Sequence, residues 1–382
     1  MMAPTGRASK ILKEKTNFAA RTIHSEIYTP EQLENGIVRL HKKTNDNQAY
    51  TIFFVDESSM ISDNKKSNDS FITDDSLLKN LINYVKQGNK KNKIVFIGDK
   101  FQLPPIQEDF SPALTKEYLT AKYNLKCNEI ELTKVMRQAD GSSILDMATI
   151  LRDQMISGNR EFNGLNISMA GLSKFAMERY LRCYNPDDIS AVTVICGANK
   201  NVDTWNNWIR KELGFGDETI SIGDFIVTQQ SHIDSDGKFI FKGEFGKITN
   251  IGIEIEQYAG FKFRDVDIEF ISMGEKVKSK CKVLLDSLTT KYGKMQYDDE
   301  RKLYAEVMKH NKKFRETKDN RDDKYLSALR IKYGYASTCH KAQGGEWKHV
   351  LIHPWKLGND LPWTYTAITR ATQSVFTYRM SA

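Results

Sequence analysis

The sequence lacks the features that would place it in several specialised classes of protein. No apolar run approaches the roughly 20 residues that span a bilayer, and the N-terminus lacks the basic, apolar and small-residue order of a signal peptide. The five cysteines of the 382 residues are scattered, and none forms a CxxC pair. A disulfide framework and a zinc site are therefore disfavoured, and we expect a cytoplasmic protein with no membrane partner.

The composition is that of a globular protein with room for two or three domains, at 40% hydrophobic and 27% charged residues. The formal net charge of +7 is compatible with a polyanionic partner such as nucleic acid. Many proteins without such a partner share this charge, so composition alone leaves the question open.

Short apolar runs that lead into helical patterns recur along the chain and predict an α/β fold. They are TIFFV (51–55), KIVFI (93–97), AVTVIC (191–196), HVLIH (349–353) and SVFTY (374–378). Nearly continuous apolar runs of this length are typical of parallel strands buried on both faces. Functional residues are then expected at the carboxyl ends of the strands.

Two stretches depart from this pattern. Residues 28–49 are polar and predict a short excursion, a hairpin, on the first α/β domain. Residues 221–290 alternate apolar and polar positions between glycine turns, which predicts a small barrel or sandwich. Within the charged stretch 298–324 that follows, RKLYAEVMKH (301–310) has an apolar helix face. We therefore divide the chain into a first domain (1–155), a second domain (156–230 with 331–382) and an insert (231–330).

Two of the apolar runs deliver residues suited to nucleotide hydrolysis. Asp56 and Glu57 follow the first, and such a pair can hold magnesium and polarise an attacking water. Gln102 follows the second and could sense a γ-phosphate. Taken alone, the first motif is more simply an acidic turn after a strand, and the second is a proline-bounded loop. The two motifs in this order are a more specific signal than either alone.

These segments resemble motifs II and III of superfamily 1B DNA helicases, of the RecD-like and bacteriophage Dda-type branches. Five further segments match the same family in order. They are APTGRAS (3–9), RTIHS (21–25), ELTKVMRQ (131–138), YASTCHKAQGGEW (335–347) and YTAITRA (365–371). The resemblance implies two RecA-like parallel-sheet motor domains, the first N-terminally incomplete, with an SH3-like insert.

The resemblance also implies roles for individual residues. Arg137 and Arg370 would reach the nucleotide phosphates as arginine fingers do, and Gly344 and Glu346 would lie beside the nucleotide. The cofactors would be ATP and Mg²⁺, with Asp56 as the magnesium ligand and Glu57 nearby. Single-stranded DNA would contact a set of residues from both domains, namely Pro4, Thr5, Arg7, Thr22, His24, Thr338, His340 and Lys341.

Each of these residues also has a plainer interpretation. Arg370 could form a surface salt bridge, and His340 could be a buried histidine with satisfied hydrogen bonds. Trp205 and Trp208 lie three residues apart in a helical run and are more typical of a core than of a base-stacking platform.

The sequence contains no phosphate loop of the form G-x-x-x-x-G-K-[ST], whose amides and lysine cradle nucleotide phosphates. Its Gly-Lys pairs, at 237, 246 and 293, precede Phe, Ile and Met and lie outside the first domain. We therefore expect weak MgATP binding and little hydrolysis by this chain alone. In the family the loop and its strand precede APTGRAS, so Met1 and Met2 are expected to end a core strand. The loss of the family's first strand and helix is expected to leave exposed apolar surface and an unpaired strand edge in the first domain.

The leading hypothesis is thus an incomplete ATP-dependent translocase and 5′–3′ helicase acting on single-stranded and fork DNA. The resemblance implies a monomer from the cytoplasm of a bacterium or a phage-infected cell, with room for a partner such as a single-strand binding protein. The alternative is a non-hydrolysing protein that binds DNA or a replication partner. A helicase joined to a nuclease finds no supporting motif.

Overall fold

The computed structural model describes residues 1–32, 38–65, 71–132, 142–158, 167–216, 218–234, 236, 239–272, 275–290, 295 and 297–379. The chain divides into two compact units. Unit 1 comprises Met1–Thr133 with Gln296–Asp319, and unit 2 comprises Lys134–Met295 with Asn320–Ala382. In the part of the chain that is described, no helix is long and apolar enough to cross a membrane.

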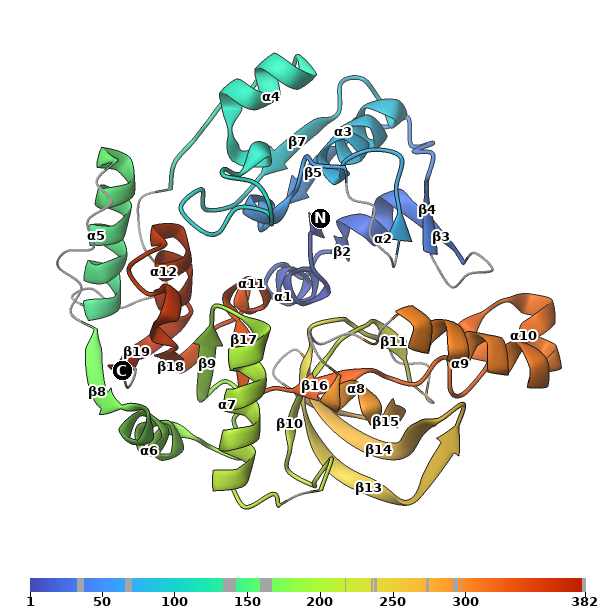
Figure 1. Cartoon of the computed structure of the whole chain (residues 1–382). Coiled ribbons are helices and arrows are strands. Elements are labelled where there is room, and N and C mark those ends of the chain that lie inside the picture. Colours follow the sequence, from blue (N-terminus) through green and yellow to red (C-terminus); the bar gives the residue numbers. More distant parts are fainter. Residues whose placement is uncertain are drawn as a thin grey trace. The chain divides into compact units, whose positions relative to one another are not determined.

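Unit 1 is built on a parallel sheet with the strand order β2-β1-β5-β7 (Figure 1). Its strands are β1 (Met2–Ala3), β2 (Arg21–Thr22), β5 (Ile52–Val55) and β7 (Lys93–Phe96). Met2 pairs with Val55 and Arg21, and both residues of β1 are buried. This confirms that the first residues of the sequence belong to a core strand.

The helices of unit 1 lie on both sides of this sheet. They are α1 (Gly6–Thr16), α2 (Ile23–Ile27), α3 (Leu77–Gly88) and α4 (Lys116–Tyr123), with 3-10 turns at Ser58–Met60 and Pro112–Leu114. The β1–α1–β2 and β5–α3–β7 connections run in opposite directions along the sheet. Because such crossovers are right-handed, α1 and α3 cover opposite faces (Figure 1).

The sheet of unit 1 buries only one of its two apolar faces in the region of β5 and β7. On the α3 side, Val55 packs with Leu78, Leu81 and Val85. On the opposite side the alternate residues remain between 38% and 43% exposed, and these are Ile52, Phe54, Val95 and Ile97. We call these four residues the open face. The expectation of exposed apolar surface is confirmed.

The excursion predicted at 28–49 is a hairpin of β3 (Tyr28–Gln32) and β4 (Val38–Lys42), paired antiparallel. A third strand, β6 (Phe71–Ile72), joins β4 in parallel and has no sequence signal at two residues' length. Unit 1 also contains α9 (Tyr297–His310) and α10 (Lys312–Thr317), which pack together through Tyr304 and Phe314. The predicted apolar face of α9 is present, with Leu303 and Val307 buried.

Unit 2 contains a second parallel sheet with the order β17-β9-β18-β19-β8. The strands are β8 (Ser168–Leu172), β9 (Val192–Cys196), β17 (Ala336–Thr338), β18 (Trp347–Ile352) and β19 (Ala371–Arg379). The helices around it are α5 (Ser143–Ser157), α6 (Ser173–Cys183), α7 (Asn199–Glu212), α11 (Cys339–Ala342) and α12 (Leu361–Ile368), with a 3-10 turn at Pro354–Lys356. Trp205 is buried in this core, as predicted, and stacks on Trp208, which is partly buried against the same core.

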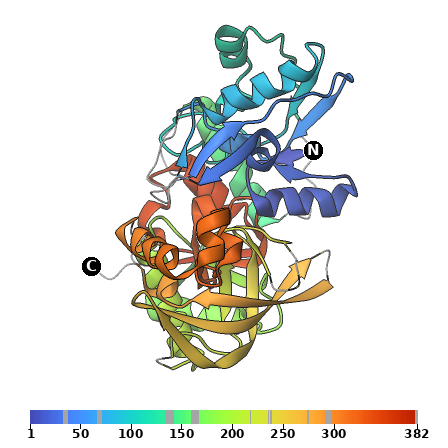
Figure 2. The ribbon, with the colours of Figure 1, turned by 90° about the vertical axis from the view of Figure 1, so that its right-hand side faces the viewer.

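A barrel of antiparallel strands is inserted into unit 2, and Figure 2 shows its strands curving around one another. The strand order is β15-β14-β13-β10-β16, and Leu329, just before β16, bridges Val283 of β15 and closes the sheet. The strands are β10 (Phe225–Thr228), β13 (Phe245–Tyr258), β14 (Phe261–Ser272), β15 (Glu275–Leu284) and β16 (Ile331–Tyr333). A small hairpin of β11 (His232–Ile233) and β12 (Phe239–Ile240), the helix α8 (Asp286–Thr289) and a 3-10 turn at Asn320–Asp322 accompany it.

A buried ion pair joins the barrel to the parallel sheet of unit 2. Arg210 of α7 donates from Nε and Nη2 to the two carboxylate oxygens of Asp224, at 2.8 and 2.9 Å. Asp224 immediately precedes β10 and also accepts hydrogen bonds from Ser221 N and Tyr335 Oη. Asn206, one turn earlier on α7, accepts from the backbone N–H of Tyr335 and Ala336. We call this cluster the joint.

We predict that Asp224→Asn lowers the free energy of unfolding of unit 2 by about 3–5 kcal/mol, because Arg210 would remain buried without its anionic partner. All five tryptophans lie in unit 2, so urea unfolding followed by tryptophan fluorescence reports on this unit. Asp187→Asn, which removes an exposed partner of Lys247, is the matched control and should cost less than about 1 kcal/mol. Equal effects of the two substitutions would contradict the role of the joint.

Candidate functional site

Asp56 and Glu57 lie at the carboxyl end of β5, in the centre of the unit 1 sheet. The backbone N–H of Asp56 donates to Met2 O at 2.9 Å, which continues the ladder, and Asp56 Oδ1 accepts from Glu57 N at 2.9 Å. Glu57 has φ 50° and ψ 39°, the left-handed conformation that a non-glycine residue adopts at a cost of about 1–3 kcal/mol. Strained residues of this kind cluster at functional sites.

Gln102 lies in the turn that follows β7. Its backbone N–H donates to Asp99 O at 3.2 Å, and the turn is closed by Phe101 N donating to Asp99 Oδ1 at 3.0 Å. The side-chain oxygen Oε1 of Gln102 is buried and accepts no hydrogen bond within the described part of the chain. A buried acceptor of this kind requires a donor, which a bound water or ligand can supply.

The loops that follow β5 and β7 are tied together close to these residues. Ser58 N donates to Ile97 O at 2.8 Å, and Ser111 Oγ donates to Ser59 O at 3.3 Å. A Cβ atom at Gly98 would lie 3.1 Å from the backbone nitrogens of Ser58 and Ser59, so glycine permits this close approach. The turn that carries Glu57 and the loop that leads to Gln102 are therefore one packed assembly.

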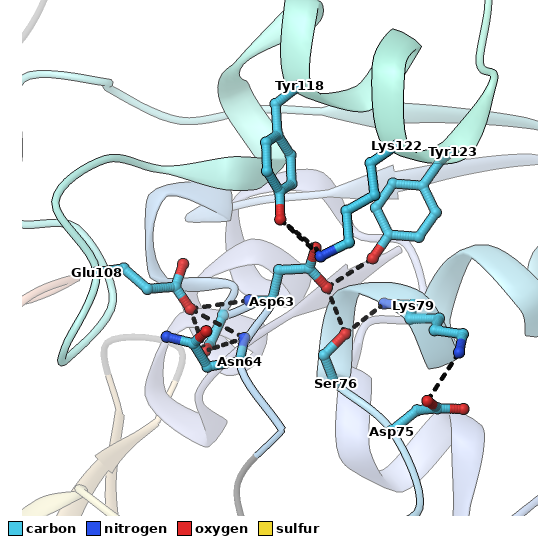
Figure 3. A network of polar contacts seen from close by, with 10 residues as sticks. Asp63, Asn64, Asp75, Ser76, Lys79, Glu108, Tyr118, Lys122 and Tyr123 are labelled. Atoms are coloured by element: carbon cyan, nitrogen blue, oxygen red, sulfur yellow. Dashed lines mark hydrogen bonds and ion pairs between the residues drawn. The ribbon is translucent and has the colours of Figure 1, made fainter.

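A polar network centred on Asp63 extends this assembly to α3 and α4 (Figure 3). The Asp63 carboxylate accepts hydrogen bonds from Tyr118 and Tyr123, both at 2.6 Å, and from Ser76, the N-cap of α3. Lys122 Nζ lies 2.8 Å from Asp63 Oδ2. The Asp63 side chain is only 2% exposed, so its charge depends on these donors.

Glu108 makes a second set of contacts across the same two loops. Its Oε1 atom accepts from Ser62 Oγ and from the backbone N–H groups of Asp63 and Asn64, the latter two at 2.9 and 3.1 Å. Asn64 Nδ2 returns a hydrogen bond to Gln107 O at 3.3 Å. We call Asp63, Glu108 and their partners the loop network.

The loop network changes the acidity of its members. Burial raises the pKa of Asp63, but hydrogen bonds from Lys122, Ser76, Tyr118 and Tyr123 outweigh it, so the pKa is below its usual value. The pKa of Lys122 is raised, chiefly by its hydrogen bond to Asp63. The ion pair is therefore formed throughout the neutral pH range. No local sequence pattern predicts this network, because the partners of the Asp63 side chain lie 13 to 60 positions away from it.

The threonines assigned to DNA contact occupy one recurring structural position. Thr5 follows β1 and caps α1, with Oγ1 accepting from Ala8 N at 3.2 Å, and Thr22 ends β2 and caps α2, with Oγ1 accepting from Ser25 N at 3.1 Å. Thr338 ends β17 and precedes α11, without a side-chain capping bond. All three lie at carboxyl ends of parallel strands, where the fold was expected to place them.

The other residues assigned to DNA contact flank these turns. Pro4 and Arg7 lie beside Thr5, and His24 lies in α2 against the ring of Tyr28, at 5.8 Å between centroids. His340 and Lys341 lie in α11. Burial lowers the pKa of His340, and Lys356 lowers it further while Asp360 opposes them. His340 is therefore mostly neutral at pH 7 and offers a hydrogen bond rather than a charge.

Three residues assigned to the nucleotide come together in unit 2. Gly344 has φ 73° and forms the tight turn after α11, and Glu346 leads from that turn into β18. Arg370, between α12 and β19, donates from Nη1 to Gly345 O at 3.4 Å and from Nε to Thr366 O at 3.1 Å. Arg370 is 1% exposed, so it is not the surface residue of the plainer interpretation. Arg137 lies outside the described residues.

We predict that Asp63→Asn lowers the free energy of unfolding of unit 1 by about 2–3 kcal/mol at pH 7, because hydrogen bonds to a charged group are lost. The pKa of Asp63 is depressed in the folded state, so its contribution is present above the unfolded pKa of about 4 and is lost as pH falls through the folded pKa. The difference between the variant and the parent should therefore shrink at pH 3.

Urea unfolding followed by circular dichroism measures this difference, and tryptophan fluorescence separates out unit 2. Glu129→Gln, which removes one member of the exposed pair with Lys100, is the matched control and should show a difference below about 1 kcal/mol. A pH-independent effect of Asp63→Asn would contradict the assignment of the charge.

Family models match both units of the chain. The model described as an AAA domain matches residues 1–165, and the model described as a UvrD-like helicase C-terminal domain matches residues 333–378. Among solved structures, the Pif1 helicase from Candida albicans aligns with 86% of this chain and 72% of that chain, at 13% identity and a TM-score of 0.48.

Two relatives align over long stretches. The ATP-dependent DNA helicase dda of Enterobacteria phage T4 is 28% identical over 286 residues, which are 71% of this chain and 60% of the relative. An uncharacterised protein of Methanocaldococcus jannaschii is 25% identical over 98% of this chain and 33% of the relative. The chain thus spans less than two thirds of the length of either relative.

Proposed function

Because the chain belongs to superfamily 1B of the helicases, we propose that it is the motor region of an ATP-dependent translocase that moves 5′ to 3′ on single-stranded DNA and unwinds duplex. One observation carries the proposal: the motifs that the structure describes lie at carboxyl ends of parallel strands, or at turns that join them, in two separate sheets. The phage T4 relative is named as an ATP-dependent DNA helicase.

In this proposal the nucleotide and magnesium contact side chains from several of the motifs. Asp56 offers a carboxylate oxygen of the hard type that Mg²⁺ prefers, and only its Oδ1 atom accepts a hydrogen bond among the described residues. Glu57 orients the attacking water. The buried Oε1 of Gln102 accepts a hydrogen bond from that water or from a neighbouring water. Bound Mg²⁺ would screen the negative charge of the phosphates. Arg370 and Arg137 would also contact the phosphates.

The turns that begin with Thr5, Thr22 and Thr338 are the proposed contacts to the DNA backbone. Each presents a hydroxyl and the N–H groups at the start of a helix, which are typical donors to phosphate oxygens. Lys341 is exposed and adds a positive charge. The hairpin of β3 and β4 and the barrel are the proposed elements for strand separation at a fork.

Further parts of the proposal concern the setting of the protein. All five cysteines are free, which supports a reducing cytoplasm. We propose that the protein acts as a monomer and contacts replication proteins such as a single-strand binding protein.

We predict that this chain alone hydrolyses MgATP at no more than the background rate, with or without single-stranded DNA, because no glycine-rich loop balances the charge of the phosphates. A coupled ADP-release assay of the chain and of Glu57→Gln tests this. Robust DNA-stimulated hydrolysis that disappears in Glu57→Gln would refute the prediction and show that other residues hold the phosphates.

We also predict that the chain binds single-stranded DNA through phosphate contacts. Fluorescence anisotropy with a labelled oligonucleotide should give an affinity that falls steeply with salt, and Lys341→Ala should weaken binding several-fold and reduce the salt slope by about one. Lys174→Ala, an exposed lysine of α6 outside every motif, is the control and should leave the affinity unchanged. Equal effects of the two substitutions would argue against the proposed DNA contacts.

A non-hydrolysing DNA-binding protein is the second candidate, favoured by the lack of a phosphate loop in the sequence. The two candidates differ in the need for Asp56, Glu57 and Arg370. If these residues serve ATP hydrolysis, addition of a phosphate-binding segment to the chain should create ATPase activity, and Glu57→Gln should abolish that activity. Continued inactivity would favour the second candidate.

A further inference from the structure

Helix α3 of unit 1 has a second, polar face that the proposed function does not use. Asn80, Asn83, Tyr84 and Gln87 are spaced three and four residues apart, so their side chains lie on one face of the helix. The opposite face of α3 packs into the core of unit 1. Three of the four polar residues carry a side-chain amide, a group that both donates and accepts hydrogen bonds.

This polar face borders a cavity of about 250 Å³, which we call the α3 cavity. Ile27 of α2 and the residues at the end of β4, namely Lys42, Lys43 and Thr44, line it as well. Lys43 holds this part of the wall against α2, because its backbone N–H donates to Ile27 O at 2.8 Å and its Nζ donates to Ser25 O at 2.7 Å. The cavity is therefore bounded by three elements that are tied together.

Asn80 is the most deeply buried of the polar residues that line the α3 cavity, at 2% exposed. Its Nδ2 atom donates to Tyr28 Oη at 2.8 Å and to Asp75 O at 3.3 Å. Because a carbonyl oxygen such as Asp75 O can only accept, this contact fixes the orientation of the amide. The Oδ1 atom is buried and accepts no hydrogen bond within the described residues. A molecule in the cavity can supply the missing donor.

Two lysines place positive charge beside these amides. Lys42 is exposed, and its Nζ lies 4.0 Å from Asp75 Oδ2, a separation at which an exposed pair contributes little. Lys43 Nζ uses one of its three N–H donors on Ser25 O. Both ammonium groups can therefore bind a phosphate at the mouth of the cavity.

The α3 cavity is continuous with a turn that is proposed to contact DNA. Helix α2 begins directly after Thr22 and ends at Ile27, so the cavity lies about 7 Å along this helix from that turn. The ring of His24 contacts the ring of Tyr28, at 5.8 Å between centroids, and Tyr28 Oη accepts the hydrogen bond from Asn80. A strand held at Thr22 can thus place a neighbouring base in the cavity.

We propose that the α3 cavity binds one unpaired adenine of single-stranded DNA. Adenine presents an amino group beside a ring nitrogen, the pattern that a side-chain amide recognises with two hydrogen bonds. The amino group donates to the amide oxygens of Asn80 and Gln87, and Lys42 and Lys43 bind the flanking phosphates. The inference rests on the proposed function in that the base belongs to the strand held at Thr22, and it adds a base preference to binding through phosphates.

Two oligonucleotides that differ in one chemical group test the proposal. Oligo(dA) is compared with a strand of the same length built from purine deoxyriboside, which is adenine without its 6-amino group. Both strands have the same phosphates and similar stacking surfaces. Fluorescence anisotropy with the full chain should show that oligo(dA) binds at least about threefold more tightly, the effect of one hydrogen bond.

Matched variants locate this preference to the α3 cavity. Asn80→Leu and Gln87→Leu should each bring the ratio of the two affinities close to one and leave the salt slope unchanged. Gln257→Leu, at an exposed glutamine of β13, should keep the ratio of the parent. Circular dichroism melting checks that the variants are folded, and Gln87 is exposed, so its substitution provides the test if Asn80→Leu does not fold.

The proposal is overturned if the parent binds the two strands equally, or if Gln87→Leu retains the preference for oligo(dA). Salt-dependent binding of both strands with no preference would overturn the α3 cavity alone and leave the proposed function intact.

Equilibrium dialysis with the two free deoxynucleoside monophosphates distinguishes the source of the adenine. A preference for the free adenine nucleotide that Gln87→Leu abolishes, without binding of either strand, would overturn the proposed function and assign the cavity to a free nucleotide. If neither the strands nor the free nucleotides show a preference for adenine, the α3 cavity is not an adenine site.

Discussion

The need of apolar parallel strands for cover on both faces is the constraint on which much of this structure depends. Strands β9, β18 and β19 of unit 2 meet it, because they are buried in a sheet surrounded by helices. In unit 1, α3 covers β5 and β7 on one side only, and the other side exposes four apolar side chains. The same strands bring Glu57 and Gln102 to one edge, so the stability of this sheet and the geometry of the site have a common origin.

The site in unit 1 depends on contacts that lie outside the residues assigned to chemistry. Glu57 adopts an unfavourable backbone conformation, and the surrounding loop has to supply the energy that keeps it there. The loop network supplies part of it, since Asp63 and Glu108 connect the turn after β5 to the loop after β7 and to two helices. Because the buried charge of Asp63 needs its four donors, it also favours this arrangement of the loops over arrangements in which the donors are lost.

Much of this fold could be predicted from local sequence. Apolar runs predicted the strands β5, β7 and β9, and alternation between glycine turns predicted the barrel strands. The spacing of Leu303 and Val307 predicted the apolar face of α9. Long-range features could not be predicted. The closure of the barrel through Leu329 and Val283 and the convergence of Tyr118 and Tyr123 on Asp63 join residues that lie 46 to 60 positions apart. No periodic pattern records such pairings. The hydrogen bond from Arg370 to Gly345 O was not predicted, since the family motifs implied only that Gly344, Glu346 and Arg370 lie near the nucleotide.

The joint between α7 and the start of β10 has a mechanical consequence. Arg210 and Asp224 form a two-point, buried connection, and Asn206 holds the strand that returns from the barrel to the sheet. Both chain crossings between the barrel and the sheet are thereby fastened to one helix. Because both crossings are held by α7, we expect the barrel to move together with that helix when unit 2 moves, rather than independently of it.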